Sequence, residues 1–264
     1  MHGPRRYNRA VEQLLRATAR AEARHFWFRG LRRFATPLVR SALRGRTAPR
    51  ILDCGCGTGA NLEFLGRFGR AYGFDLSELG PRLAREAGRT AIARATVTAA
   101  PFPSAAFDLV TSFDVLYSLE EPDEAAAAGE LFRVLKPGGH AVINVAAMPM
   151  LTGDHSVLSR ERRRYTRASL RRLLERAGFT VVRLTYTHAT LFVPLALARG
   201  FHRWRGLATE AEAHREIGVP AAAVNAALSA LLALESLWLR VVDNPFGSSL
   251  LCLARKPDGG AGLR

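Results

Sequence analysis

Residues 51–59, ILDCGCGTG, constrain the fold of this chain more than any other stretch. An apolar run leads to Asp53, and glycine then occupies every second position, at Gly55, Gly57 and Gly59. Glycine has no Cβ, so it reaches positive φ angles and lets the backbone come close to a ligand. The segment that follows has the apolar spacing of a helix. A strand, a glycine turn and a helix predict the first βα unit of a nucleotide-binding sheet.

The glycine spacing is G-x-G-x-G, which differs from the G-x-G-x-x-G of dinucleotide-binding proteins. With Asp53 in front, it resembles the first motif, D/E-x-G-x-G-x-G, of the class I S-adenosylmethionine (SAM) methyltransferases. The resemblance implies an α/β, Rossmann-like, seven-stranded sheet, SAM as the cofactor, and cofactor contacts from Asp53 and the three glycines. Asp75 ends the predicted strand 71–76, 16 residues after Gly59. There its carboxylate can accept hydrogen bonds from both ribose hydroxyls. A glycine turn without a ligand is the alternative.

The chain is strongly basic, with a net charge of +15 and a pI of about 11.2. Such a charge is typical of proteins that bind nucleic acid or an anionic membrane. Lysine occurs only at Lys136 and Lys256, so 36 of the 38 basic residues are arginine. Arginine and alanine richness together also indicate a coding bias, which would explain the charge without any partner.

The three cysteines show neither a metal-binding spacing nor a disulfide framework, which favours a reducing, cytoplasmic compartment. The first ten residues contain no apolar run, so the sequence predicts no signal peptide. With 264 residues, 48% of them hydrophobic, we expect one large domain or a core with an appendage.

Aromatic and arginine side chains alternate in residues 25–34, HFWFRGLRRF. The block resembles the N-terminal H-x-W-F-x-x-R signature of one bacterial methyltransferase family, similar to methyltransferase types 11 and 12. The resemblance implies a cap over the cofactor, in which Arg29 or Arg33 meets the SAM carboxylate. The alternative, compatible with the first, is a helix whose aromatic residues only pack on the sheet.

Two more strand ends are candidates for cofactor contacts. After the predicted strand 91–97, the segment APFP matches an L-P-F site of relatives, so Thr96 stands where many relatives have an acid for the adenine amino group. The strand predicted for residues 107–116 places Phe113 and Asp114 beside the methionine part of SAM. Downstream, residues 130–145 resemble the helix, K-P-G-G turn and fifth strand of these enzymes.

The resemblance continues through R-R-Y-T-x-x-S-L at residues 163–170 to P-F-G-S-S-L at 245–250, which is followed by a last strand. Residues 221–242 are apolar enough to suggest a membrane span, but Glu235 and Arg240 favour an amphipathic lid, or a helix pair that touches a membrane or a second subunit. The sequence therefore predicts an N-terminal helical cap (1–45), a SAM-binding core (46–188 with 245–257), a helical lid (189–244) and a disordered tail (258–264).

Methyl transfer needs an aligned acceptor and often one base. His155, beside Asp154 in the loop after the fifth strand, is the candidate base, because imidazole titrates near neutral pH. Tyr165 is a candidate to hydrogen-bond the acceptor. Arg163 and Arg164 are candidates for an anionic group on it. No carboxylate cluster indicates a metal site.

These patterns favour a SAM-dependent methyltransferase acting on a small or lipid-like acceptor, most readily at a hydroxyl group. A nucleic-acid enzyme is the alternative suggested by the charge. The N/D-P-P-Y/F motif of base-modifying relatives is missing, however, because residues 114–117 read DVLY. A SAM-fold protein without transferase activity is a third alternative. A homodimer and a peripheral membrane contact are both left open.

Overall fold

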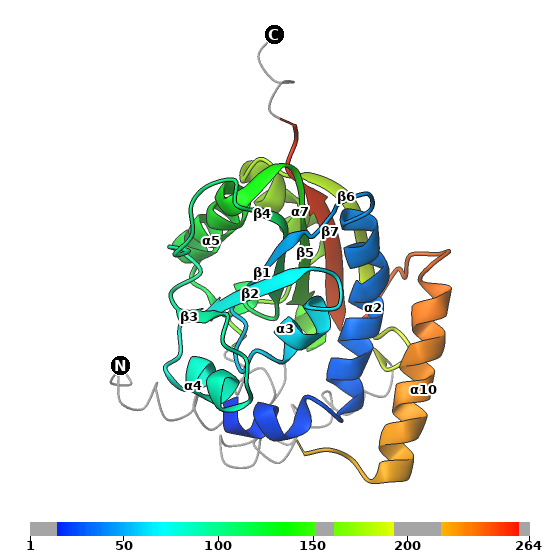
Figure 1. The fold of residues 1–264 in the computed structure, drawn as a ribbon. Coiled ribbons are helices and arrows are strands. Elements are labelled where there is room, and N and C mark those ends of the chain that lie inside the picture. Colours follow the sequence, from blue (N-terminus) through cyan, green and yellow to red (C-terminus); the bar gives the residue numbers. More distant parts are fainter. Residues whose placement is uncertain (1–14, 152–160, 193–217, 259–264) are drawn as a thin grey trace, which may run out of the picture.

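The computed structural model describes residues 15–151, 161–192 and 218–258, and its centre is a seven-stranded sheet in the order β3-β2-β1-β4-β5-β7-β6 (Figure 1). The strands are β1 Arg50–Cys54, β2 Arg70–Asp75, β3 Ile92–Arg94, β4 Phe107–Phe113, β5 Leu135–Ala146, β6 Thr180–Thr187 and β7 Ser249–Arg255. The helices are α2 Phe26–Ala42, α3 Ala60–Leu65, α4 Leu79–Glu86, α5 Glu121–Val134, α7 Arg167–Arg176 and α10 Ala222–Trp238, with short 3₁₀ turns η1 Leu116–Ser118 and η2 Pro149–Leu151.

The sheet confirms the predicted fold class. Strand β7 runs antiparallel to both β5 and β6, whereas the pairs from β3 to β5 are parallel. The chain proceeds outward from β1 to β3 on one side and from β4 to β5 on the other, so the strand order reverses between β1 and β4. In open α/β sheets, ligands bind beyond the carboxyl ends of the strands at such a reversal.

Two predicted boundaries move in the structure. The fourth strand ends at Phe113, because Asp114 has φ +62° and leaves the extended conformation. The predicted K-P-G-G turn is the first part of β5, where the pairing with β4 is irregular.

Alternate residues of the strands fill the core on opposite faces of the sheet. Leu52 packs with the buried residues of α5 and α7, whereas its neighbour Ile51 packs with those of α2, α3 and α10. This alternation is what a strand covered on both faces requires. Helices therefore flank both faces, and α2 and α10 share one of them (Figure 1).

Hydrogen bonds join helix α10 to helix α2. The Phe26 N–H donates to Asn225 Oδ1 at 2.9 Å, and Arg33 donates to the Ser229 carbonyl at 2.7 Å. Within the described part of the chain, no helix is both long and apolar enough to cross a membrane. Helix α10 covers most of the predicted helical stretch 221–242 and ends at Trp238, whereas most of the earlier part of the predicted lid lies outside the described residues.

The buried carboxylate of Glu235 explains how an acid is accommodated in an apolar helix. Its Oε1 accepts hydrogen bonds from the Ala189 N–H and from Asn244, and its Oε2 accepts from the N–H and hydroxyl of Thr190, all at 2.6–3.1 Å. Glu235 thus joins α10 to the end of β6 and to the approach to β7.

We expect Glu235→Ala to lower the free energy of unfolding by about 3 kcal/mol, because four buried donors lose a charged acceptor. Urea denaturation measures this. Glu175→Ala, which removes an exposed glutamate of α7, is the control and should change stability by less than about 0.5 kcal/mol. Equal effects of the two substitutions would contradict the anchoring role.

Candidate active site

The glycine loop leaves β1 with three residues in the left-handed region. The φ angles of Gly55, Gly57 and Gly59 are +78°, +52° and +77°. A Cβ built on Gly55 would overlap the side chain of Val115, which follows β4. The loop after β1 and the loop after β4 therefore touch at the point where the strand order reverses, and only glycine fits at Gly55.

Asp75, at the end of β2, holds this loop in place. Its Oδ2 accepts a hydrogen bond from the Gly57 N–H and its Oδ1 accepts one from the Ser77 N–H, both at 2.9 Å. A carboxylate has about four acceptor positions. The half-buried Asp75 therefore keeps capacity for further donors, such as the ribose hydroxyls of a nucleoside.

Asp53 lies under the loop and is almost completely buried. The Thr111 hydroxyl donates to its Oδ1 at 2.6 Å, whereas its Oδ2 has no hydrogen-bond partner among the described residues. Burial raises the pKa of Asp53 to about 7, and the nearby Asp75 adds to the rise, although the bond from Thr111 opposes it. An orphan carboxylate oxygen in such a place is suited to a cationic ligand group.

Asp114, which follows β4 and is half-buried, is a second carboxyl group at this edge. Its left-handed backbone is uncommon for a residue with a side chain. Asn144 of β5 donates to its Oδ1 at 2.8 Å. Burial raises the pKa of Asp114 to about 7. The carboxyl ends of β1, β4 and β5 thus bring Asp53 and Asp114 to the same edge of the sheet.

Two further predicted cofactor residues lie at or near strand ends. Thr96 follows β3, and its hydroxyl is within hydrogen-bonding distance of the Thr98 hydroxyl at 2.9 Å. The buried Phe113 packs in the cluster beneath α2. Contacts of Thr96 and Phe113 with the cofactor stay predictions.

Sequence analysis missed two residues that contact the glycine loop or the helix after it, Glu22 before α2 and Arg32 within α2. The Thr58 hydroxyl donates to Glu22 Oε1 at 2.6 Å. Arg32 donates to Asn61 Oδ1 and to the Glu22 carbonyl, each at 3.2 Å. Burial raises the pKa of Glu22 and lowers that of Arg32. Arg32 therefore lies against the start of α3.

The two arginines predicted to meet the SAM carboxylate are placed differently. Arg29 is exposed, and Arg33 bonds to α10. A signal for Arg32 was present in the same RGLRR run, but the sequence does not reveal how α2 is rotated about its axis.

Tyr165 and Arg163 share one partner. The Tyr165 hydroxyl and the Arg163 guanidinium both donate to the buried Glu124 of α5. Burial, with the adjacent Glu124, raises the pKa of Tyr165. These bonds tie the segment after residue 160 to α5. A contact of either residue with an acceptor stays a prediction.

Arg164 is buried and has several partners of its own. It pairs with Glu161 at 2.9 Å and donates to the Ala147 carbonyl at 2.6 Å. Its predicted contact with an anionic acceptor also stays a prediction. His155 and Asp154 lie outside the described residues.

We expect Gly55→Ala to abolish binding of S-adenosylhomocysteine, because the new Cβ would overlap Val115 at the contact between the two loops. Calorimetric titration measures the affinity. Gly45→Ala is the matched control, since Gly45 has φ +76° and open space around it. That variant carries a similar backbone strain and should keep its affinity. Unchanged binding in Gly55→Ala would place the ligand elsewhere.

The two raised pKa values predict a pH dependence of binding. Below pH 7 the carboxyls of Asp53 and Asp114 are protonated and neutral, and above it they are ionised. Affinity for the ammonium group of S-adenosylhomocysteine should rise roughly tenfold from pH 6 to pH 8 for each carboxylate that faces it.

Asp114→Asn should flatten this rise, whereas Asp123→Asn, which removes an exposed charge of α5, should not. Asparagine also tolerates the left-handed backbone of residue 114. Affinity that stays constant between pH 6 and pH 8 in the unaltered protein would refute the assignment.

Comparisons with known proteins agree with this geometry. The sequence model of the family described as "Methyltransferase domain" matches residues 19–184, more than half of the chain. A probable S-adenosylmethionine-dependent methyltransferase of Mycolicibacterium smegmatis is 31% identical over 162 residues, which are 60% of this chain and 60% of that protein. A demethylmenaquinone methyltransferase of Anoxybacillus flavithermus is 32% identical over 114 residues, 39% of this chain and 47% of that protein. The chain thus spans about half to three fifths of these curated relatives.

Solved structures share the fold at low identity. An S-adenosylmethionine-dependent methyltransferase of Mesorhizobium loti has a TM-score of 0.53 and 22% identity, covering 84% of this chain and 97% of that one. An N-methyltransferase of Haemonchus contortus, bound to phosphomonomethylethanolamine and S-adenosylhomocysteine, has a TM-score of 0.54 and 18% identity, covering 84% and 52%.

Family and fold imply S-adenosylmethionine as the cofactor. Two observations fit such a ligand: Asp53 Oδ2 has no hydrogen-bond partner among the described residues, and the loop leaves no room for a side chain at Gly55. The chain therefore belongs to the methyltransferase-domain family, and its sheet is the class I fold of SAM-dependent methyltransferases.

Proposed function

We propose that this chain transfers the methyl group of SAM to a small molecule that carries an acidic hydroxyl group, such as a phenol or an enol. The observation that carries the proposal is the group of carboxylates Asp53, Asp75 and Asp114, which surrounds the glycine loop at the strand reversal. When bound, SAM supplies an electrophilic methyl group on a sulfonium centre. The protein has to bind the cofactor and the acceptor, orient them for transfer and exclude water.

Each carboxylate is assigned one part of the cofactor. Asp75 already accepts the Gly57 N–H and has acceptor capacity for the ribose hydroxyls. Asp53 and Asp114, whose pKa values are near 7, become favourably ionised when an ammonium group lies between them. Thr96 and Phe113 are assigned to the adenine and methionine ends. Arg32, which touches α3, replaces Arg29 in our assignment of the cap.

The nature of the acceptor is supported by the curated relatives. One is a demethylmenaquinone methyltransferase, and others, from Yersinia, are C-methyltransferases of ubiquinone and menaquinone biosynthesis. A reduced quinone is an aromatic ring with acidic hydroxyl groups. Once its hydroxyl proton is removed, either the oxygen or a neighbouring ring carbon can attack a methyl donor. O-methylation and C-methylation therefore make the same demand on the protein, which is removal of a hydroxyl proton.

We assign removal of that proton to His155, because this residue follows the carboxyl end of β5 in the sequence. Tyr165 and Arg163 are assigned a positioning role instead of an acceptor contact. Both donate to Glu124, so their bonds fix the segment after residue 160. Arg164, which is buried against Glu161, has the same role.

The test is transfer of labelled methyl from SAM to a panel of soluble phenols and reduced quinones, with the product identified by mass spectrometry. We expect label in hydroxyl-bearing acceptors and none in the matched compounds whose hydroxyl groups are already methylated. His155→Ala should lower turnover by roughly 100-fold, the usual effect of a positioned base, and leave S-adenosylhomocysteine affinity unchanged.

Stoichiometric, site-specific labelling of RNA or DNA would overturn the proposal in favour of the nucleic-acid enzyme. Equal labelling of the free and the blocked acceptors would exclude proton removal from a hydroxyl. Weak, sequence-independent binding to nucleic acid would decide nothing, because a pI of about 11.2 produces it in any case.

A further inference from the structure

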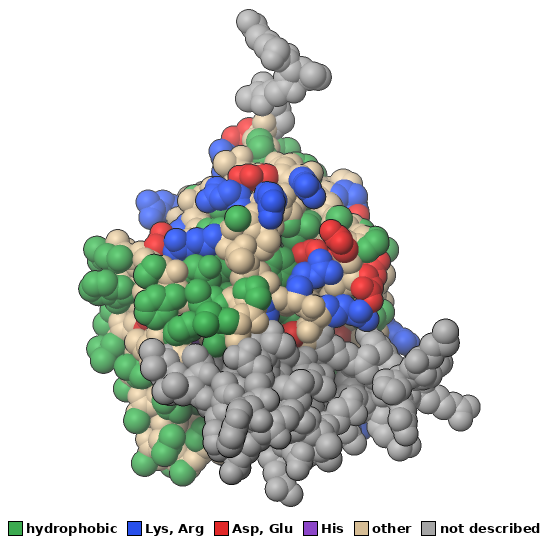
Figure 2. All heavy atoms as spheres, turned by 180° about the vertical axis from the view of Figure 1, so that it is seen from behind, with side chains coloured by type: hydrophobic (Ala, Val, Ile, Leu, Met, Phe, Trp, Pro, Cys, Tyr) green, Lys and Arg blue, Asp and Glu red, His purple; other side chains and the backbone are tan. Residues whose placement is uncertain are grey.

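The outer face of α10 is apolar and uncovered. Ser229, Leu232 and Glu235 are the buried residues of this helix and face the protein. On the opposite side, Leu234, Leu237 and Trp238 are 65%, 51% and 58% exposed, and Val241 in the turn that follows is 86% exposed. Figure 2 shows apolar side chains gathered along this edge of the molecule, at the left of that view. We call these four residues the apolar ridge.

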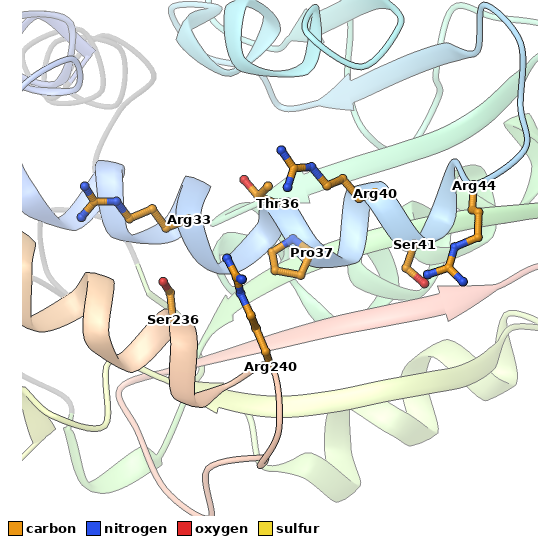
Figure 3. Close-up of a pocket in the computed structure, with 8 residues that line it drawn as sticks. All are labelled: Arg33, Thr36, Pro37, Arg40, Ser41, Arg44, Ser236 and Arg240. Atoms are coloured by element: carbon orange, nitrogen blue, oxygen red, sulfur yellow. The ribbon is translucent and has the colours of Figure 1, made fainter.

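A row of arginines runs along the neighbouring helix. Arg29, Arg33 and Arg40 follow one another at intervals of four and seven residues, which keeps them on one side of α2, and Arg44 follows directly after the C-cap Leu43. Arg240, just after α10, points toward Pro37 of α2 (Figure 3). Four of these five arginines line a groove of about 340 Å³ between the two helices, together with Thr36, Ser41 and Ser236. We call the five the arginine row.

The charge of this row is not neutralised within the described residues. None of the five arginines forms an ion pair with a described carboxylate, and Arg33 bonds only to the backbone carbonyl of Ser229. Two acids in α10 and the residues after it have other partners. Glu235 is buried among its four donors, and Asp243 pairs with Arg183 at 2.8 Å. The groove therefore presents positive charge to its surroundings.

An apolar ridge containing tryptophan beside a row of cations is the arrangement of a helix that lies in a membrane interface. The apolar side chains enter the boundary of the acyl chains, and the cations meet the lipid phosphates. Because α10 is joined to α2 and β6, it can lie on a membrane as part of the folded domain.

We propose that the apolar ridge and the arginine row bind the surface of an anionic phospholipid bilayer. Two other occupants fit less well. A second copy of the chain, packed by twofold symmetry on the apolar ridge, would cover the ridge but would leave the cations of the arginine row without a counter-charge. A soluble anion could occupy the groove but would leave the apolar ridge in water. The inference is independent of the acceptor proposed above.

Co-sedimentation of the full chain with vesicles tests the proposal. We expect binding to vesicles that contain phosphatidylglycerol, much weaker binding to pure phosphatidylcholine, and a decrease as salt rises from 50 to 500 mM, concentrations chosen to screen surface charge. Arg40→Glu with Arg240→Glu should weaken binding by at least about tenfold. Trp238→Ser should weaken it at all salt concentrations, because it removes apolar insertion.

Arg85→Glu is the matched control, since Arg85 is an exposed arginine of α4 beside the opposite edge of the sheet. It should bind vesicles as the unaltered protein does, and thermal unfolding checks that every variant is folded. Three results would overturn the proposal. The first is equal binding of the chain to both vesicle types. The second is a chain that binds no vesicles but forms a dimer, which Trp238→Ser abolishes. The third is a chain that binds no vesicles but binds inorganic phosphate saturably, with this binding lost in the double variant.

Discussion

Two carboxyl groups at the carboxyl edge of this sheet are held where ionisation is unfavourable. Asp53 is buried beneath the glycine loop with one oxygen unpartnered, and Asp114 is bonded to Asn144 on a left-handed backbone. Burial outweighs the attraction of Arg32 for Asp53 and of Arg164 for Asp114, and this cost explains why the pKa values of both carboxyl groups lie near 7. A cationic cofactor would supply a positive charge beside these carboxylates. The same arrangement therefore lowers the stability of the protein without cofactor and favours the complex with cofactor.

The sequence was most informative where structure is local. A strand end followed by glycine places Asp53 correctly because β1 and its turn are adjacent in the chain. Asp75 is found in the same way at the end of β2. The side chains of these residues point to one edge because parallel strands share their carboxyl ends. Local pattern and parallel topology together were therefore enough to predict the sheet and the position of Asp53 and Asp75 at strand ends.

Partners far apart in sequence were beyond such reasoning. Tyr165 and Arg163 suggested an acceptor site, yet both bond to Glu124, which is 41 residues before Tyr165. Arg32 rather than Arg29 reaches α3 because of the rotation of α2, which depends on packing against α10. Glu235 suggested a helix that avoids a membrane, whereas its structural role is to hold the end of β6. These outcomes depend on tertiary contacts, which no local pattern records.

The most direct test of this account is the crystal structure of the chain with S-adenosylhomocysteine. The account predicts the ribose hydroxyls within hydrogen-bonding distance of Asp75 and the ammonium group beside Asp53 or Asp114, with the backbone of the glycine loop against the ligand. A ligand bound in another part of the molecule, for example between α2 and α10, would contradict it. So would a ligand in the loop whose ammonium group lies away from both carboxylates.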